Sequence, residues 1–188
     1  SPGNSPYAIT VGATNTRGTV SRADDVMATY SSRGPSLGDM VLKPDVVAPG
    51  NRIVALGAPG STLYESPFAV QSGDGKGTPP LLELSGTSMA APAVSGVAAL
   101  MLSRDGSAGP GDVKARLMVT ATKVQGDIWT RGAGQVEPYA AVWSLTTPGA
   151  PVAALSPICM PTEDGAYDLL DPLTKDSISW ADRVVWGD

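Results

Sequence analysis

Apolar and polar residues follow patterns that predict short strands in the first half of the chain. Residues 7–13 (YAITVGA) have the β-branched, short apolar character of a buried strand, and residues 48–56 (APGNRIVAL) contain a second one after a Pro-Gly turn. Residues 41–47 (VLKPDVV) are apolar at both ends, but Pro44 cannot donate a hydrogen bond to a neighbouring strand, so this run predicts a weak strand at most. Residues 81–84 (LLEL) predict a further strand, which leads directly into a Ser-Gly-Thr-Ser string.

Helical patterns follow that strand. Residues 89–102 are mostly Ala, Val, Leu and Met, apolar nearly all the way round, which predicts a helix buried on most sides. Residues 109–120 predict a second helix, because Pro110 suits the first turn and Asp112 favours the positive end. A third, short helix is expected over residues 137–143. The pattern as a whole therefore predicts a protein of mixed α/β class.

Composition narrows the class of protein. The chain has 188 residues, 42% hydrophobic and 16% charged, which suits one compact globular domain with a substantial core. Its net charge of -5 comes without any block of basic residues, so no nucleic-acid partner is expected. Cys159 is the only cysteine, which excludes an intrachain disulfide and a cysteine-based metal cluster. The most apolar run, residues 94–102, is too short to span a bilayer, so no membrane span is expected.

The domain organisation is predicted from changes in composition along the chain. We expect residues 1–146 to form one unit and residues 147–188, which open with several prolines, to form a linker and a C-terminal extension. Residues 177–186 (SISWADRVVW) look like a strand pair or an edge segment. Residues 57–80 form a long excursion, and a loop of that length is often functional. Residues 1–7 (SPGNSPY) look like the middle of a loop, so we expect the start to be a cut through a larger protein.

The candidate chemistry centres on Ser88, which lies where the strand of residues 81–84 is expected to give way to a helix. The N-terminal end of a helix presents unpaired N–H groups and a partial positive charge, and both stabilise a developing oxyanion. Pro92 has no N–H to donate to the Ser88 carbonyl, which loosens the first turn at that residue. An isolated serine in this position is most simply a helix N-cap, so the residues around it decide between the two interpretations.

Those residues resemble a known family. The string SGTSMAAP at residues 85–92, followed by Val94 and Gly96, closely resembles the serine motif of the subtilisin-like serine proteases, the subtilases. Four further segments resemble landmarks of the C-terminal catalytic half of that family in the same order: ITVGA (9–13), YSSRGP (30–35), KPDVVAPG (43–50) and GAGQV (132–136). The resemblance covers residues 2–143. Ala93 replaces a histidine that many members have after the proline, but that histidine is not the catalytic base.

The chain contains no histidine, although a serine nucleophile needs a base. An α/β-hydrolase would place its histidine after the serine, and residues 86–90 (GTSMA) also lack the final glycine of its G-x-S-x-G motif. Subtilisin-like enzymes run in the order Asp, His, Ser, so the serine comes last. The absent histidine therefore favours a subtilisin-like chain whose base lies upstream.

Other residues in the chain are weaker candidates for that chemistry. Asn4 lies in a setting that resembles the loop just after the oxyanion segment, so the true asparagine is expected upstream, and Asn15 and Asn51 are typical of turns. Strand alternation places Glu83 on the face opposite Leu82 and Leu84, facing solvent. A Ser-Lys arrangement is possible in principle, but Lys43 and Lys76 have the local surroundings of exposed loop lysines.

Metal sites are not indicated by spacing. Asp45 follows a proline and is expected to cap a turn, while Asp24, Asp25 and Asp74 lack the ligand spacing of a recognised calcium loop. The carbonyls of Gly3, Ser5 and Ala8 could contribute to a weak cation site like one that some subtilases have there. No cofactor is expected, and a structural calcium ion is possible without a location that the sequence specifies.

The resemblance implies a fold, an activity and partners. It implies a three-layer α/β subtilisin-like fold with a mostly parallel sheet, of which residues 1–146 supply the C-terminal part. Ser88 would be the acyl-enzyme nucleophile, its N–H half of the oxyanion hole, and Ser85, Gly86 and Thr87 would bind the protein or peptide substrate. The N-terminal part of the protease would carry the Asp, His and Asn, so the isolated chain is expected to be inactive. Residues 58–61 and 184–188 resemble those of secreted bacterial members, which implies secretion. The alternative is a non-catalytic protease-like scaffold or binding module.

Overall fold

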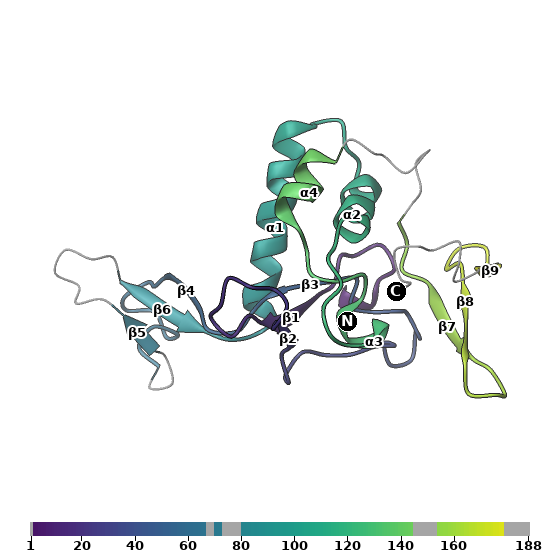
Figure 1. Ribbon diagram of the computed structural model, residues 1–188, viewed down its shortest axis with the longest axis horizontal. Coiled ribbons are helices and arrows are strands. Elements are labelled where there is room, and N and C mark those ends of the chain that lie inside the picture. Colours follow the sequence, from purple (N-terminus) through teal and green to yellow (C-terminus); the bar gives the residue numbers. More distant parts are fainter. Residues whose placement is uncertain (1, 67–69, 73–79, 145–153, 179–188) are drawn as a thin grey trace.

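The computed structural model describes residues 2–66, 70–72, 80–144 and 154–178. Figure 1 shows helices standing over a small central sheet, with a second sheet projecting on one side and a third on the other. The elements in chain order are η1 (Pro2–Asn4), β1 (Val11–Asn15), β2 (Val26–Met27), β3 (Val46–Pro49), β4 (Ile53–Leu56), β5 (Val70–Ser72), β6 (Leu81–Leu84), α1 (Thr87–Arg104), α2 (Pro110–Val119), α3 (Ile128–Arg131), α4 (Pro138–Trp143), β7 (Ile158–Pro161), β8 (Tyr167–Leu170) and β9 (Ser177–Ile178).

The central sheet has the order β2-β1-β3. β1 and β3 are parallel, with Val11 opposite Val46 and Thr14 opposite Pro49, and β2 pairs antiparallel with the end of β1. Two of the predicted strands begin later in the structure than the sequence pattern indicated. The strand expected from residue 7 begins at Val11, because residues 2–8 form consecutive turns instead. The weak strand expected at residues 41–47 is a buried one that begins at Val46, so the missing N–H of Pro44 lies outside the ladder.

Helix α1 packs against β1 and β3 through one stripe of small and branched residues. Ala90, Val94, Val97 and Met101 are buried, at the spacing that places residues on one face of a helix. The expectation that this helix is buried on most sides is wrong for the described part of the chain. Leu100 is 58% exposed and Leu102 is 44% exposed, and most of the other α1 residues outside the stripe are exposed as well.

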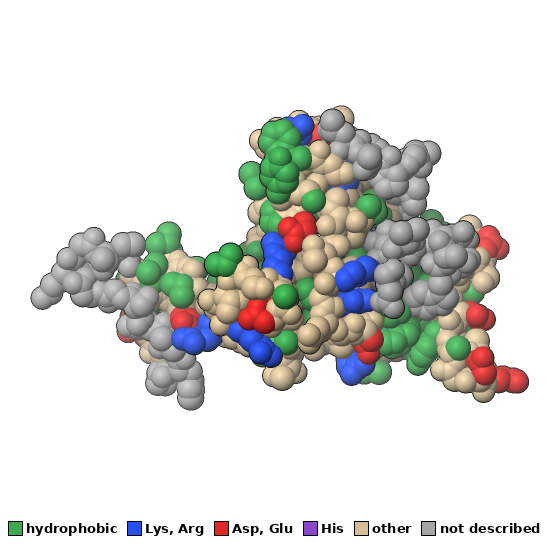
Figure 2. Space-filling model, in the orientation of Figure 1, with side chains coloured by type: hydrophobic (Ala, Val, Ile, Leu, Met, Phe, Trp, Pro, Cys, Tyr) green, Lys and Arg blue, Asp and Glu red, His purple; other side chains and the backbone are tan. Residues whose placement is uncertain are grey.

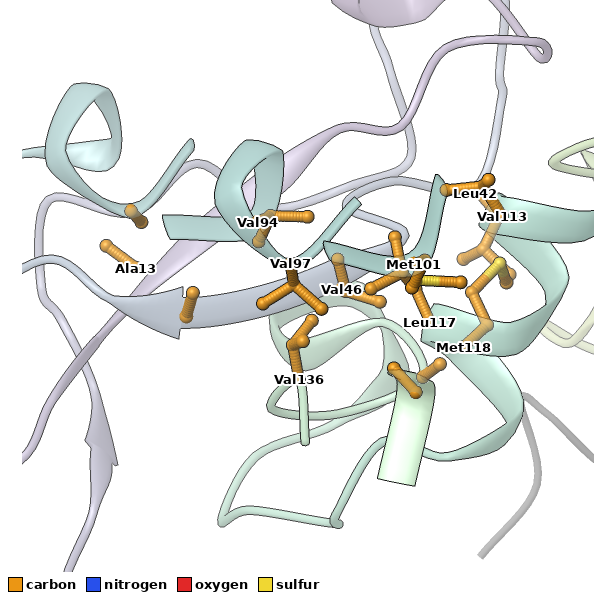
Figure 3. Packing of buried hydrophobic residues seen from close by; sticks show 14 of the residues in the cluster. Ala13, Leu42, Val46, Val94, Val97, Met101, Val113, Leu117, Met118 and Val136 are labelled. Atoms are coloured by element: carbon orange, nitrogen blue, oxygen red, sulfur yellow. The ribbon is translucent and has the colours of Figure 1, made fainter. Parts of the chain in front are cut away.

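The core continues from α1 into α2 and the central strands. Figure 3 shows Met101 of α1 beside Leu117 and Met118 of α2, with Val46 of β3 and Val136 nearby. The second and third predicted helices are confirmed as α2 and α4, while the one-turn helix α3 was not predicted. Its four residues are too few to show a helical period.

The two outer sheets are antiparallel. β6 lies between β4 and β5, and β8 lies between β7 and β9. A mixed α/β architecture is confirmed, but a mostly parallel sheet is not: among the described strands, β1 and β3 form the one parallel ladder. The reason is local, because the turn at residues 162–166 joins β7 directly to β8, and short connections return antiparallel strands.

The β7–β8–β9 sheet is attached to the central part near residue 42. Leu42 N–H donates to the Pro157 carbonyl at 2.8 Å, and Cys159 N–H donates to the Met40 carbonyl at 2.7 Å. The predicted boundary at residue 146 and the linker after it fall partly outside the described residues, so they stay predictions. The same holds for most of the strand pair expected at 177–186, of which β9 is described. None of the described helices has the length and apolarity needed to cross a bilayer.

Candidate active site

Ser88 is the second residue of α1, directly after β6 and the Ser85–Gly86 turn, and its side chain is exposed. The predicted strand-to-helix junction is therefore confirmed. The N-cap residue is Gly86, with no side-chain capping bond, so Ser88 does not serve as an ordinary cap. Within the described residues, its hydroxyl has no hydrogen-bond partner. An exposed hydroxyl thus stands next to the unpaired N–H groups of a helix N-terminus.

The turn before Ser88 is fixed to β3 through two glycines. Gly86 N–H donates to the Gly50 carbonyl at 2.8 Å. A Cβ on Gly50 would lie 2.7 Å from the Gly86 carbonyl oxygen and 2.8 Å from the Cβ of Ala13, which is too close for any real side chain. Gly50 is therefore required for this approach, and it determines where the first turn of α1 lies relative to the central sheet.

Tyr30 supports the same contact. Its hydroxyl donates to the Gly50 carbonyl at 2.8 Å, so that oxygen accepts from both Gly86 and Tyr30. Desolvation raises the pKa of the Tyr30 phenol above its ordinary value, against the opposing effect of hydrogen bonds with the Gly86 backbone and the Ser85 side chain. A phenol at its ordinary pKa of 10.0 is already protonated at neutral pH, so Tyr30 keeps its donor hydrogen there.

Ser85 and Thr87, both predicted to bind substrate, lie on either side of Gly86. The Ser85 hydroxyl accepts from Arg52 N–H at 2.9 Å, which ties the turn to the start of β4. Thr87 lines a depression of about 240 Å³ together with Gly3, Asn4 and residues of the segments 10–12, 32–36 and 43–44. The structure thus brings Ser85, Gly86, Thr87 and Ser88 together in one turn that is open to solvent on the Ser88 side.

The alternative bases do not reach this turn. Glu83 lies on the face of β6 opposite Leu82 and Leu84, as expected, but its side chain is only 21% exposed rather than facing solvent, and its carboxylate accepts from Arg52 Nε at 2.9 Å. The expectation that Lys43 is an exposed loop lysine is wrong, because its side chain is 7% exposed and ion-paired with Asp45 at 2.8 Å. Lys76 lies outside the described residues. Neither Glu83 nor Lys43 is therefore placed to take a proton from Ser88.

Asp45, expected to cap a turn, belongs instead to a buried ionic cluster. We define this Asp45 cluster as Lys43, Asp45, Lys114 and Ser156. Lys114 Nζ lies 3.0 Å from Asp45 Oδ1 and donates to Ser156 Oγ at 2.7 Å, and Lys43 Nζ donates to the same oxygen at 2.9 Å. Asp45 also accepts from Thr10 N–H at 2.7 Å. Two ammonium groups thus share one carboxylate, and the cluster joins the residues just before β3 to α2 and to the C-terminal segment.

The other polar candidates serve the fold. The Ala8 carbonyl, expected as part of a weak cation site, accepts from the ammonium groups of both Lys43 and Lys114 at 3.0 Å. Asp25 is buried and accepts from Gln135 Nε2 at 2.8 Å. Asn4 donates to Asp39 at 3.2 Å. Among the described residues, no three His, Cys, Asp or Glu side chains gather as a metal site would require; Asp74 lies outside those residues.

Sequence reasoning missed Tyr30, Gly50 and the Asp45 cluster. The first two carried a signal, because they lie in the YSSRGP and KPDVVAPG segments that resemble the family. Lys43 and Asp45 lie in the second of these segments too, but nothing in the sequence linked them to Lys114 or to Ser156, which is 113 positions from Lys43. The assembled site holds an exposed hydroxyl beside the N–H groups of a helix N-terminus, and neither Glu83 nor Lys43 is placed to act as its base.

The amino-acid sequence is similar to that of serine proteases from bacteria and plants. Serine protease AprX of Bacillus subtilis (strain 168) is 40% identical over 114 residues, which make up 61% of this chain and 24% of that protein. Subtilisin-like protease SBT3.6 of Arabidopsis thaliana is 43% identical over 100 residues, 52% of this chain and 11% of that protein. The chain therefore corresponds to a quarter or less of the length of these relatives.

Solved structures share the fold. Fervidolysin from Fervidobacterium pennivorans, a keratinolytic enzyme related to subtilisin, matches with a TM-score of 0.62 at 24% identity, over 90% of this chain and 26% of that chain. MycP1 with its N-terminal propeptide removed matches with a TM-score of 0.50 at 28% identity, over 76% of this chain and 38% of that chain. The model of the subtilase family, Peptidase S8, matches residues 1–136. The chain that places Ser88 at this junction therefore belongs to the subtilase family of serine proteases.

Proposed function

We propose that this chain is the C-terminal part of the catalytic domain of a secreted subtilisin-like serine endopeptidase, with Ser88 as its acyl-enzyme nucleophile. The observation that carries the proposal is the exposed Ser88 hydroxyl on the first turn of α1, in a turn fixed by Gly50 and Gly86. Family membership supports it, because the catalytic serine of subtilases comes last in chain order.

The proposed reaction uses residues from two parts of the protease. Ser88 Oγ attacks the carbonyl carbon of the peptide bond while the histidine of the N-terminal part takes its proton. The Ser88 N–H and the asparagine of the N-terminal part stabilise the negative oxygen that forms. The C–N bond then breaks, the proton passes to the leaving amine, and water hydrolyses the acyl-enzyme. The chain alone has no histidine and is expected to be inactive.

Helix α1 offers a surface for the N-terminal part. Its exposed face carries Ala93, Gly96 and Leu100, and the position of a Cβ on Gly96 meets only open space. A face of small and apolar residues allows another element to approach closely, and its burial would stabilise the pair. We expect Gly96→Arg to weaken binding of the N-terminal part without unfolding the chain, and Glu163→Arg, on the exposed turn between β7 and β8, to leave it unchanged. Size-exclusion chromatography of the mixed parts measures the difference.

Labelling with a fluorophosphonate tests the nucleophile. The assembly of this chain with the N-terminal part should be labelled at Ser88 and should hydrolyse casein, and Ser88→Ala should abolish both, with a loss in kcat on the order of a million-fold. Ser95→Ala, an exposed serine two turns along the same helix, is the matched control and should keep full activity. An assembly that forms but takes no label would instead establish the alternative, a protease-like scaffold without catalysis.

A further inference from the structure

The depression beside the turn that carries Ser88 has walls from two separate segments of the chain. Its volume is about 240 Å³, and Thr87 is part of its lining. One wall comes from residues 3–12 and the other from residues 32–44. Because Thr87 directly precedes Ser88, the spacing of these two walls determines what can lie next to the candidate nucleophile.

The first wall is fixed from behind by Ser156, in the segment that leads into β7. Ser156 is fully buried, and its N–H donates to the Pro6 carbonyl at 3.0 Å. Its hydroxyl donates to Asp45 and accepts from the two ammonium groups of the Asp45 cluster at 2.7 and 2.9 Å. Both ammonium groups also donate to the Ala8 carbonyl at 3.0 Å. The loop that forms this wall is therefore held by Ser156 directly and through its partners in the cluster.

The second wall is held by the next residues of the same segment. Leu42 N–H donates to the Pro157 carbonyl at 2.8 Å, and Cys159 N–H donates to the Met40 carbonyl at 2.7 Å. The residues between these two bonds form an antiparallel bridge. Four consecutive residues, 156–159, therefore contact the segments that form both walls of the depression.

These four residues are packed into the fold, although they begin the sheet at the C-terminal side of the chain. Figure 2 shows acidic side chains at the outer end of that sheet, over the turn between β7 and β8, where Glu163 and Asp164 are exposed. At its inner end, Ser156 and Cys159 are 0% exposed. The inner end of the sheet is thus part of the structure that holds the depression.

The turn that carries Ser88 is held by different contacts. Gly86 N–H donates to the Gly50 carbonyl, and the Ser85 hydroxyl accepts from Arg52 N–H. These bonds do not pass through residues 156–159. Loosening residues 156–159 should therefore change the spacing of the walls and leave the Ser88 hydroxyl in place.

We propose that residues 156–159 brace both walls of the depression, and that Ser156 is a positioning residue for the substrate that Ser88 cleaves. The proposal rests on the proposed function, because a peptide whose carbonyl carbon reaches Ser88 passes Thr87. Walls that are ordered by folding need not be ordered by the substrate, so the brace lowers KM. It lies beyond residues 1–136, which match the subtilase family model, and is therefore a contribution of the C-terminal segment.

Kinetics of the active assembly test Ser156. With fluorescein-labelled casein, Ser156→Ala should raise KM by about 3–10-fold and change kcat by less than about twofold, because the walls loosen while the turn that carries Ser88 stays in place. Ile178→Ala, in β9 of the same sheet, is the matched control. It removes apolar contacts two strands away from the brace and should leave KM unchanged. If Ser156→Ala does not fold, Ser156→Cys keeps a weak donor and acceptor there and should give a smaller rise in KM.

Two kinetic results would overturn the proposal: a wild-type KM in a folded Ser156 variant, or equal increases in KM in the Ser156 variant and in Ile178→Ala. If the assembly hydrolyses no casein, the proposed function fails, and hydrogen exchange in the 188-residue chain then tests the brace separately. The Thr10 N–H, which donates to Asp45 at 2.7 Å, should exchange about tenfold faster or more in Ser156→Ala, while the Gly86 N–H should not change. Equal acceleration of both amides, or none at Thr10, would contradict the brace.

Discussion

Lys114 allows a quantitative test of the buried cluster that holds the C-terminal segment. Its side chain is 2% exposed, and its ammonium group contacts Asp45, Ser156 and the carbonyls of Pro6 and Ala8. Burial lowers the pKa of Lys114 from 10.5 to about 8, and the nearby Lys43 ammonium acts in the same direction, against the attraction of Asp45. The fold thus holds this proton less tightly than the unfolded chain does.

The sign of the effect on stability follows from proton binding. Between pH 8 and 10.5 the unfolded chain binds more protons at Lys114 than the folded chain, so the free energy of unfolding rises with pH. The gap between the two pKa values corresponds to about 3 kcal/mol. This penalty is fully present below pH 8 and disappears as the pH rises towards 10.5.

Urea unfolding of the wild-type chain and of Lys114→Met at pH 7 to 10 measures this pH-dependent penalty in the free energy of unfolding. The stability advantage of the wild type over the variant should grow by about 2–3 kcal/mol from pH 7 to pH 10, because the variant has no proton to lose there. Lys175→Met, at an exposed turn, should show a difference from wild type that does not change with pH. A difference for Lys114→Met that is flat, or that shrinks with pH, would show that Lys114 keeps an ordinary or raised pKa.

Three further predictions concern the turn, the core and the C-terminal sheet. Gly50→Ala should lower the free energy of unfolding in urea by about 1–3 kcal/mol and reduce kcat of the assembly, because the new Cβ would displace the Gly86 carbonyl. Gly96→Ala should instead raise the free energy of unfolding by about 0.5–1 kcal/mol, because a Cβ there meets open space and alanine favours the helix. Gln135→Met should lower stability by about 1–3 kcal/mol or more in thermal unfolding, since it removes the donor to buried Asp25 and the acceptor for Thr14, whereas Thr14→Val should cost less. Cys159, whose pKa burial raises to about 12, should resist iodoacetamide at pH 8 and react only in denaturant; rapid labelling in buffer would mean that the β7–β8–β9 sheet opens readily.

The parts of the fold that the sequence predicted well are those determined by neighbouring residues. The strand of residues 81–84 and the helix after it are local patterns, so the position of Ser88 at their junction followed from the string itself. The helix beginning at Pro110 followed in the same way from a proline and an acidic first turn. Such features need no knowledge of what the chain contacts elsewhere.

The parts that were predicted wrongly depend on distant contacts. Lys43 lies among residues typical of a surface loop, yet it is buried because Asp45 and Ser156 supply acceptors for its ammonium group. For helix α1 the prediction failed in the opposite direction. Its composition predicts burial on most sides, but the buried residues of α1 are the stripe Ala90, Val94, Val97 and Met101. Whether a charged or a small residue is buried depends on the residues that contact it in the fold, and a single sequence does not show which residues those are.

The uncovered face of α1 and the missing base have one explanation if the N-terminal part docks on this helix. Residues 85–88 would then hold the proposed nucleophile and its N–H donor in one turn tied to Gly50, while the proposed histidine would be positioned only through the docking surface. A small shift at Leu100 or Gly96 would move that histidine relative to Ser88 and leave the turn intact. Substitutions on that face should therefore lower kcat of the assembly without changing the stability of the turn, which separates docking from the position of Ser88.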